Sequence, residues 1–146
     1  MSGLNGKVAL ITGAGGMRGV GRATALQLAQ QGVELALSDV LREPQDLPPA
    51  EVRVGWRGLD SVAEEVRAHG KRCLTVPCDL GYSDQIQALV KQVLSHFGRI
   101  DILVNNARAI IGRDKVPITE LPKEVWNHFL AINTTAVFLL TQMVGR

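Results

Sequence analysis

The sequence is poor in aromatic residues and carries little net charge. Phenylalanine, tryptophan and tyrosine make up 4% of its 146 residues, and the formal net charge is +2. No run of basic residues is interleaved with aromatic side chains. Proteins that bind nucleic acids usually carry a basic patch, often with aromatic side chains for stacking. The sequence therefore gives no support for a nucleic-acid partner.

Long apolar segments are also missing. The longest uninterrupted apolar run is Ala136–Leu140, whereas a membrane-spanning helix needs about 20 predominantly apolar residues. We therefore expect no transmembrane helix and no membrane partner. The N-terminal stretch Val8–Ile11 is apolar, but glycines interrupt the pattern at once, so it does not make a secretory signal. These features predict a cytoplasmic protein.

Cysteine and histidine are scarce. The two cysteines, Cys73 and Cys78, occur without a secretory signal, which indicates reduced, packed thiols rather than a disulfide framework. The three histidines, His69, His96 and His128, are dispersed along the chain without the spacing of metal ligands. The sequence therefore predicts no metal site.

What the sequence does contain is an alternation of short β-branched runs with longer amphipathic segments. Its apolar content of 46% and charged content of 21% are ordinary for a globular protein, and its length suits one domain, residues 1–146. The short runs predict buried parallel strands, and the longer segments show the period of helices. The predicted strands cover residues 7–12, 33–39, 72–78 and 100–105. The predicted helices cover residues 20–31, 59–70, 83–97 and 123–144, with Ser83 as the N-cap of the third.

This order of strands and helices predicts an α/β fold of the Rossmann type. Right-handed crossovers give a doubly wound parallel sheet, and the expected strand order is 3-2-1-4, truncated before the later strands of such a fold. Residues 41–56 contain three prolines and little periodicity, so we expect a surface loop that is longer than an ordinary connection. The sequence shows no internal repeat and no second domain.

A glycine-rich turn separates the first predicted strand from the first predicted helix. Glycine allows positive φ in a tight turn, lets the backbone approach a pyrophosphate, and lets the helix pack closely on the strand. The helix N-terminus adds unpaired N–H groups that favour phosphate. A glycine cluster is a weak signal by itself, but its place between a strand and a helix is the context that a dinucleotide site requires. The candidate cofactor-binding residues of this turn are Thr12, Gly13, Gly15, Arg18, Gly19, Val20 and Gly21.

An acidic residue, Asp39, ends the second predicted strand. A carboxylate at this place accepts hydrogen bonds from the ribose hydroxyls of adenosine and repels a 2′-phosphate, so NAD is the favoured cofactor. Arg18 favours NADP instead, because a cation in the glycine turn can hold the extra phosphate, and Arg42 is a further cation. Asp39 alone is equally well explained as a solvated loop acid. Combined with the glycine turn, it predicts nucleotide binding.

At this point the sequence resembles the short-chain dehydrogenase/reductase family over essentially the whole chain. The glycine turn resembles the family's Thr-Gly-x-x-x-Gly-x-Gly motif, lengthened by two residues between Gly13 and Gly19. Three further motifs follow in the family's order, each on its expected element. They are the acidic pair Asp79–Leu80 after the third strand, Asn105, Asn106 and Ala107 after the fourth strand, and Asn133 in the last helix.

The resemblance implies a role for each of these polar residues. Asp79 would accept a hydrogen bond from the adenine amino group, and Asn105 and Asn106 would bind loop backbone and the cofactor ribose. Asn133 would be the asparagine of the catalytic set, at a local helix irregularity that serves a proton relay. The residues alone also allow plainer roles, namely a helix-entry acid, an ordinary turn and a buried amide that serves one local carbonyl.

The sequence departs from the family pattern in two places. Arg108 stands where the family has the glycine of its Asn-Asn-Ala-Gly motif, which puts a long cation near the cofactor groove. The family's catalytic serine and its Tyr-x-x-x-Lys motif would follow Arg146, the last residue. Tyr82 is the only tyrosine, and Ile86 stands where the lysine would be, so it is no substitute.

The resemblance implies an NAD(P)-dependent oxidoreductase that interconverts an alcohol and a ketone by hydride transfer. Its partner would be a small carbonyl or alcohol substrate. Because the serine, tyrosine and lysine are missing, we expect this chain to supply the dinucleotide-binding half and to be inactive alone. The last predicted helix is apolar nearly all round, which predicts a homo-oligomer, a dimer or a tetramer, in the complete protein.

Two alternatives stay open from the residues alone. A non-catalytic module that senses NAD would bind the cofactor without further catalytic residues. A methyltransferase also places an acid after its second strand, although Thr12, Gly13 and the asparagines of residues 105–107 argue against it. A purely structural role is the weakest interpretation, since it leaves the glycine turn and Asp39 unexplained.

Overall fold

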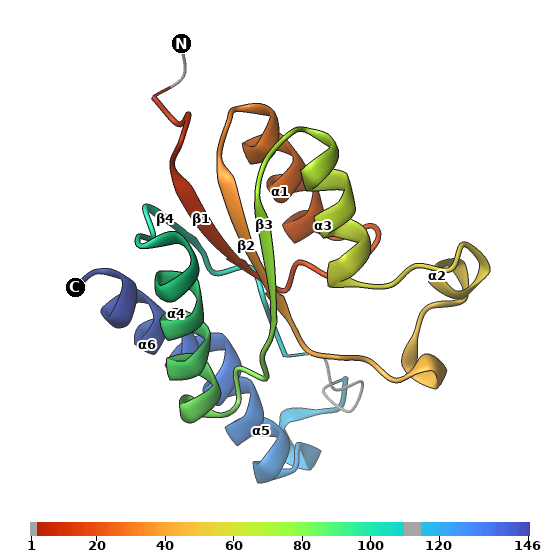
Figure 1. Ribbon diagram of the computed structural model, residues 1–146. Coiled ribbons are helices and arrows are strands. Elements are labelled where there is room, and N and C mark those ends of the chain that lie inside the picture. Colours follow the sequence, from red (N-terminus) through yellow and green to blue (C-terminus); the bar gives the residue numbers. More distant parts are fainter. Residues whose placement is uncertain (1–2, 110–114) are drawn as a thin grey trace.

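A four-stranded parallel sheet forms the centre of the protein in the computed structural model, which describes residues 3–109 and 115–146 (Figure 1). The strand order is β3-β2-β1-β4, which confirms the predicted order. In the register of the sheet, Leu10 pairs with Ala36 on one side and with Leu103 on the other. The strands are β1 (Val8–Thr12), β2 (Glu34–Asp39), β3 (Cys73–Pro77) and β4 (Ile102–Val104).

Helices cover both faces of the sheet, as a doubly wound fold requires (Figure 1). Successive strand residues point to opposite faces, so Ala9 and Ile11 pack against one helical layer while Leu10 packs against the other. The first layer contains α1 (Val20–Gln30) and α3 (Leu59–Ala68). The second contains α4 (Ser83–Phe97) and α6 (Ala136–Val144).

Burial on both faces explains why β1 reads as a continuous apolar run. All five of its residues are buried, and Leu10 and Ile11 are completely inaccessible to solvent. Each large side chain buried in this way contributes about 1.5–3 kcal/mol to folding. The sheet therefore holds the carboxyl ends of β1 and β2 rigidly side by side, and the predicted site residues follow those ends.

Residues 41–56 are not simply a surface loop. They contain a 3₁₀ turn (Pro44–Asp46) and a short helix, α2 (Pro49–Arg53), and Glu51 of α2 is buried. Prolines suit the first turn of a helix, because proline lacks the N–H that would be unpaired there. We therefore correct the loop prediction: the prolines start short helices in this segment rather than exclude them.

The N-cap prediction for α4 was wrong. The helix begins at Ser83 itself, the capping position is Tyr82, and no side chain makes a capping hydrogen bond there. The preceding turn is held by Asp79 instead, whose carboxylate accepts from the Gly81 N–H at 2.8 Å and whose carbonyl accepts from the Tyr82 N–H at 3.2 Å. A turn closed by Asp79 places Ser83 one residue too late to act as the cap.

The predicted helix over residues 123–144 is present but irregular. It consists of α5 (Lys123–Leu130), a π-helical turn (Ala131–Thr135) and α6. Val125, Ile132 and Leu140 of this stretch are buried. Three large apolar side chains of α5 and α6 stay substantially exposed, namely Trp126 (49%), Leu130 (41%) and Phe138 (59%). An exposed apolar face fits the predicted subunit interface, which stays a prediction.

The described helices include none that combines the length and the apolar character needed to cross a membrane. The same part of the chain, residues 3–109 and 115–146, contains no group of three or more His, Cys, Asp or Glu side chains arranged to hold a metal ion.

Replacing Asp101 with asparagine should make the stability of the protein less dependent on pH under acidic conditions. Arg99, the Val8 N–H at 2.9 Å and Lys7 at 3.3 Å lower the pKa of Asp101 from 3.8 to about 2. A carboxyl pKa that is lower in the folded state stabilises the protein above about pH 4, and this contribution disappears as the pH falls toward about 2. The effect should not exceed about 1 kcal/mol, because the ion pairs are partly solvated.

Thermal unfolding at several pH values checks this expectation. The midpoint of the wild type should fall more steeply between about pH 4 and pH 2 than the midpoint of Asp101→Asn. Asp60→Asn, which changes an exposed acid in the first turn of α3, is the matched control and should keep the wild-type slope. Equal slopes for all three proteins would contradict the role of Asp101.

Candidate functional site

The predicted cofactor residues converge at the carboxyl ends of the strands. A recess lies there between the glycine turn, the ends of β2 and β3, and the segment that follows β4. Its lining includes six of the predicted residues, namely Thr12, Gly13, Asp39, Asp79, Leu80 and Ala107. It also includes residues that the sequence did not predict as ligands, namely Ser38, Val40, Cys78, Arg108 and Ile132. We call these eleven residues the strand-end recess.

Gly13 and Gly21 show why the turn requires glycine. Gly13 has a φ of 66°, and a Cβ atom there would lie 2.7 Å from the Cα of Ala107. A Cβ atom on Gly21, in the first turn of α1, would lie 2.7 Å from the Gly13 carbonyl oxygen. Both distances are shorter than real contacts allow. The helix, the turn and the segment after β4 can therefore approach one another only without these side chains.

Thr12 and Asn106 join the glycine turn to the end of β4. The Thr12 hydroxyl oxygen accepts from the backbone N–H groups of Asn106 at 3.2 Å and Ala107 at 3.1 Å. The Asn106 side-chain amide donates to the carbonyl oxygens of Thr12 at 2.8 Å and Gly13 at 2.9 Å. The prediction that Asn106 binds loop backbone is thus confirmed. Its amide positions the glycine turn from within the protein.

Asp39 contacts the same turn from the end of β2. One oxygen of its half-buried carboxylate accepts from the Gly15 N–H at 2.7 Å, and the other accepts from the Val40 N–H at 2.8 Å. A carboxylate oxygen can accept more than one hydrogen bond. Asp39 can therefore bind two hydroxyl groups of a ligand while it holds the turn.

Asp79 acts at the entry to α4, which is one of its two suggested roles, and its contact with adenine stays a prediction. Its carboxylate stabilises the turn that leads into α4, as described above, and its side chain also lines the strand-end recess. Its neighbour Leu80 is buried, with 8% of its surface exposed, and adds an apolar wall. Asp39 at the end of β2 and Asp79, which follows β3, thus line the same recess.

Asn133 lies in the π-helical turn, and the helix irregularity that the resemblance implied is thereby confirmed. Its side-chain oxygen accepts from the Ala109 N–H at 2.9 Å, so it fastens the segment after β4 rather than a local helix carbonyl. Asn133 is exposed and is not among the residues of the strand-end recess. The expectation of a buried amide is therefore corrected.

The remaining predicted residues lie around the recess rather than in its lining. Arg18, Val20 and Asn105 are exposed, whereas Gly15 is buried and Gly19 is half-buried. Arg108, the departure from the family motif, does line the recess. Both arginines are exposed, but only Arg108 belongs to the lining, and the predicted cation Arg18 lies outside it.

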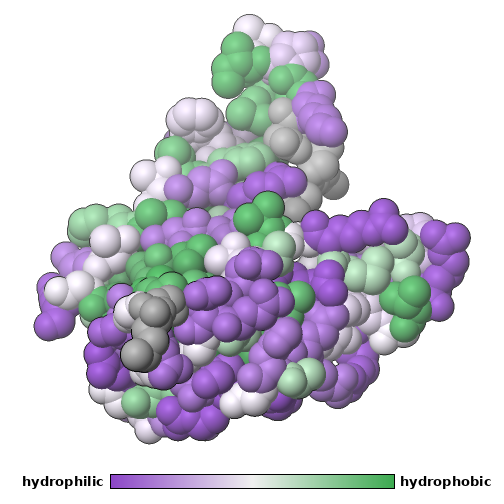
Figure 2. Space-filling view, turned by 90° about the horizontal axis from the view of Figure 1, so that it is seen from above, coloured by the Kyte–Doolittle hydropathy of each residue, from purple (hydrophilic) through white to green (hydrophobic). Residues whose placement is uncertain are grey.

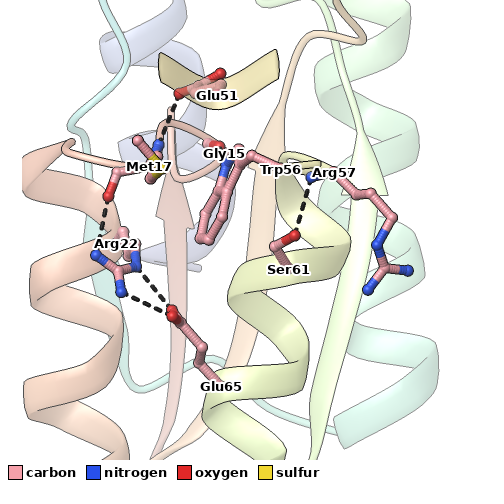
Figure 3. Close-up of polar contacts among 8 residues, drawn as sticks. All are labelled: Gly15, Met17, Arg22, Glu51, Trp56, Arg57, Ser61 and Glu65. Carbon is pink, nitrogen blue, oxygen red and sulfur yellow. Dashed lines mark hydrogen bonds and ion pairs between the residues drawn. The ribbon is translucent and has the colours of Figure 1, made fainter. Parts of the chain in front are cut away.

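Trp56 and Arg22 hold the glycine turn from its other side, and the sequence did not reveal either role (Figure 3). The Trp56 indole N–H donates to the Gly15 carbonyl at 2.8 Å, and the Arg22 guanidinium lies 5.3 Å from the centroid of the same indole. Arg22 also donates to the Met17 carbonyl at 2.9 Å and forms two bonds of 2.7 Å with Glu65. A lone Trp in a proline-rich segment carries no pattern that could have predicted this contact.

Glu51 is a further residue that sequence reasoning missed. Its carboxylate accepts from the Met17 N–H at 2.9 Å, across 34 residues of sequence (Figure 3). The second carboxylate oxygen lies 3.6 Å from a guanidinium nitrogen of Arg42. Three side chains from outside the turn, Glu51, Trp56 and Arg22, therefore bind its backbone in addition to Asp39 and Asn106.

The cysteines do not add reactive chemistry to the site. Cys73 and Cys78 are both free and buried, which confirms the predicted packed thiols. Burial is the main cause that raises the pKa of each to about 11, and the acids Asp79 and Asp84 contribute at Cys78. Both side chains are therefore neutral thiols at neutral pH, although Cys78 lines the recess.

Comparison with known proteins agrees with this geometry. The family model described as short chain dehydrogenase matches residues 7–146. Among curated proteins, a 3-oxoacyl-[acyl-carrier-protein] reductase of Synechocystis is 36% identical over 146 residues, which is 100% of this chain and 52% of that protein. The chain thus spans about half the length of the curated relatives it matches.

Solved structures with bound nicotinamide cofactors share the fold. A xylitol dehydrogenase with bound NAD⁺ superposes with a TM-score of 0.79 at 33% identity, over 99% of this chain and 48% of that one. A blue fluorescent protein from a metagenomic library, in complex with NADPH, gives a TM-score of 0.77 at 29% identity, over 97% of this chain and 51% of that one. The motifs, the strand order and the family match agree, and the chain belongs to the short-chain dehydrogenase family.

Proposed function

We propose that this chain binds NAD at the strand-end recess and forms the dinucleotide-binding part of an oxidoreductase that interconverts an alcohol and a ketone. The observation that carries the proposal is the Asp39 carboxylate, which lies 2.7 Å from the Gly15 N–H and lines the recess together with Gly13. An acid at the end of the second strand, beside a glycine turn, is the arrangement that holds an adenosine ribose.

The residues of the recess fit such a ligand. The missing Cβ of Gly13 lets the segment after β4 pack closely against the turn, and the N-terminus of α1 that follows favours a diphosphate. Asp39 would accept from the ribose hydroxyls, and Asp79 would accept from the adenine amino group at the neighbouring strand. When bound, the nicotinamide cofactor supplies the hydride chemistry of the reaction. The residues described here bind and orient it.

NAD is favoured over NADP because of the charge at the ribose end. The Asp39 carboxylate would repel the 2′-phosphate that distinguishes NADP. Arg18, which is exposed, stays the alternative partner for that phosphate. The two cofactor-bound relatives described above carry NAD⁺ and NADPH respectively, so the family itself accommodates both.

Isothermal titration calorimetry with NAD and NADP tests the proposal. NAD should bind with the lower Kd, and Asp39→Asn should raise that Kd about tenfold, because charge-assisted hydrogen bonds to the ribose are weakened. Asp84→Asn, which neutralises an exposed acid in the first turn of α4, is the matched control and should keep the wild-type Kd. If neither cofactor produces saturable binding to the folded wild type, the proposed function is wrong.

The reaction itself and the assembly are parts of the same proposal. A small alcohol or carbonyl compound would be the substrate, and the exposed apolar face with Trp126, Leu130 and Phe138 would lie between subunits of a homo-oligomer. Family membership counts against a methyltransferase. A module that only senses NAD would show the same cofactor binding and would differ in having no substrate turnover in the complete protein.

A further inference from the structure

The strand-end recess combines apolar walls with a few charged side chains. Leu80 and Ile132 are among its apolar residues, and both are buried. Its charged residues are two acids, Asp39 and Asp79, and one cation, Arg108. Ligand pockets of this kind hold an apolar ring against their walls and orient it with a small number of polar groups. The recess therefore suits a nucleobase, and the acids suit the hydroxyl and amino groups of adenosine.

The guanidinium of Arg108 is not paired with the acids that line the recess with it. It forms an ion pair neither with Asp39 nor with Asp79, nor with any other acid among residues 3–109 and 115–146. The two carboxylates accept from backbone N–H groups instead. Opposite charges that line one recess without neutralising one another stay available to a ligand.

Exposure places Arg108 at the open side of the recess. The residue is exposed to solvent, whereas Cys78 and Leu80 of the same lining are only 3% and 8% exposed. A long side chain in such a position can lie along an apolar surface while its charged end keeps contact with water. The planar guanidinium of arginine also stacks on aromatic faces. Arg108 can therefore cover a flat ring that enters the recess.

The diphosphate of the proposed cofactor would lie outside this lining. A helix N-terminus is the favoured place of a diphosphate. Helix α1 begins at Val20 after its capping residue Gly19, and neither residue belongs to the recess. The ribose next to the diphosphate would meet Asp39. The adenine ring is therefore the part of the dinucleotide that is left for the apolar walls of the recess and for Arg108.

We propose that Arg108 covers the adenine ring of the bound dinucleotide by stacking its guanidinium on the face of the ring. The inference rests on the proposed function, because it requires the adenosine end of the cofactor to lie in the strand-end recess. It gives a binding role to the residue that stands where the family motif has glycine, which has no side chain to cover the ring. The contact holds NAD and NADP alike, since both carry the same adenine.

Calorimetry with NAD and NADP tests this contact. Arg108→Ala should raise the Kd of NAD about fivefold to tenfold, which is the range for the loss of one stacking contact on a base. The Kd of NADP should rise by the same factor, because the adenine ring is common to both cofactors. The midpoint of thermal unfolding should stay at the wild-type value, since Arg108 is exposed, and this measurement separates lost binding from lost structure.

Arg53→Ala is the control for the loss of one positive charge. Arg53 is an exposed arginine of α2, in the segment of residues 40–58 that extends away from the sheet (Figure 1). In the view from above, this segment forms a lobe at the right of the molecule (Figure 2). Arg53 does not belong to the lining of the recess. Its variant should therefore keep the wild-type Kd for both cofactors.

Two further variants separate stacking from charge. Arg108→Phe keeps a flat face and removes the charge, whereas Arg108→Lys keeps the charge and removes the planar group. Stacking predicts that the phenylalanine variant binds NAD more tightly than the lysine variant does. The loss of affinity in Arg108→Ala should also persist at high salt, because salt screens an exposed contact between a cation and a phosphate much more than it weakens ring stacking.

The possible results separate this inference from the proposed function. An unchanged Kd of NAD in Arg108→Ala would overturn the inference, because the side chain would then not contact the ring. A loss confined to NADP, or a full recovery by lysine but not by phenylalanine, would overturn it as well and would show that Arg108 binds a phosphate through its charge. In each of these cases the wild type still binds a nucleotide, so the proposed function survives. Only the absence of saturable binding by the wild type removes both.

Discussion

Gly13→Ala should unfold at a markedly lower temperature than the wild type and should lose most of its affinity for NAD. The φ of 66° at Gly13 costs an alanine about 1–2 kcal/mol, and the new Cβ would meet the Ala107 Cα at 2.7 Å. Overpacking of this kind adds about 1–3 kcal/mol. We expect a loss of roughly 2–5 kcal/mol in the free energy of unfolding.

The affinity for NAD should fall because the turn must move to relieve the contact between the new Cβ and Ala107. A shift of the Gly13 peptide disturbs the two carbonyls that Asn106 holds, and with them the backbone that would face the diphosphate. The NAD Kd should rise at least about tenfold, measured by calorimetry on protein that remains folded at the assay temperature.

Gly16→Ala provides the control within the same turn. A Cβ atom at Gly16 would have its nearest neighbour, the Gly19 Cα, at 3.9 Å, which is an ordinary contact, and its φ is not positive. The free energy of unfolding of this variant should stay within about 0.5 kcal/mol of the wild type. Equal destabilisation of Gly13→Ala and Gly16→Ala would show that the close approach to Ala107 is not what the turn requires.

Thr12→Val should be the next most damaging substitution. Valine has nearly the same shape as threonine but lacks the hydroxyl that accepts from the N–H groups of Asn106 and Ala107. Thr12 is only 2% exposed, so water cannot replace the lost acceptor. The free energy of unfolding should fall by about 2 kcal/mol, in the range for a buried donor left without a partner. Chemical denaturation with urea measures this difference.

Thr12→Ser distinguishes the contribution of the hydroxyl group to stability from that of the methyl group. Serine keeps the acceptor and loses one methyl, which costs about 1 kcal/mol in a packed interior. Serine should therefore be less harmful than valine, although it removes more volume. If valine proves the milder substitution, the hydroxyl does not hold the glycine turn to the end of β4.

Much of the fold could be predicted because its signals are local. The apolar run at Val8–Thr12 and the period of residues 83–97 each identify an element from neighbouring positions alone. The parallel strand order then follows from the handedness of the crossovers. The prediction was wrong where a local signal had two explanations. The prolines of residues 41–56 indicated a loop but also suit the first turn of a short helix, such as α2.

Only part of the candidate site could be predicted from such local signals. Asp39 and Gly13 were found because each must occur at one position of a strand–turn–helix unit, and both line the recess. Asn133 was found through the family motif, but its partner Ala109 was not, since the bond joins residues 24 positions apart. Arg18 was predicted as a cofactor-binding residue because it lies in the glycine turn. In the structure its side chain is exposed and lies outside the lining of the recess.

The sequence by itself determined the parallel sheet, the glycine turn and the acid at the end of β2, because periodicity and residue type act over a few neighbouring positions. Only the tertiary structure decided what holds that turn. The bonds from Glu51 to Met17, Trp56 to Gly15 and Asn106 to Thr12 span 34, 41 and 94 residues. Such contacts form because packing of the sheet and helices brings distant segments together. A pattern of neighbouring residues cannot predict them.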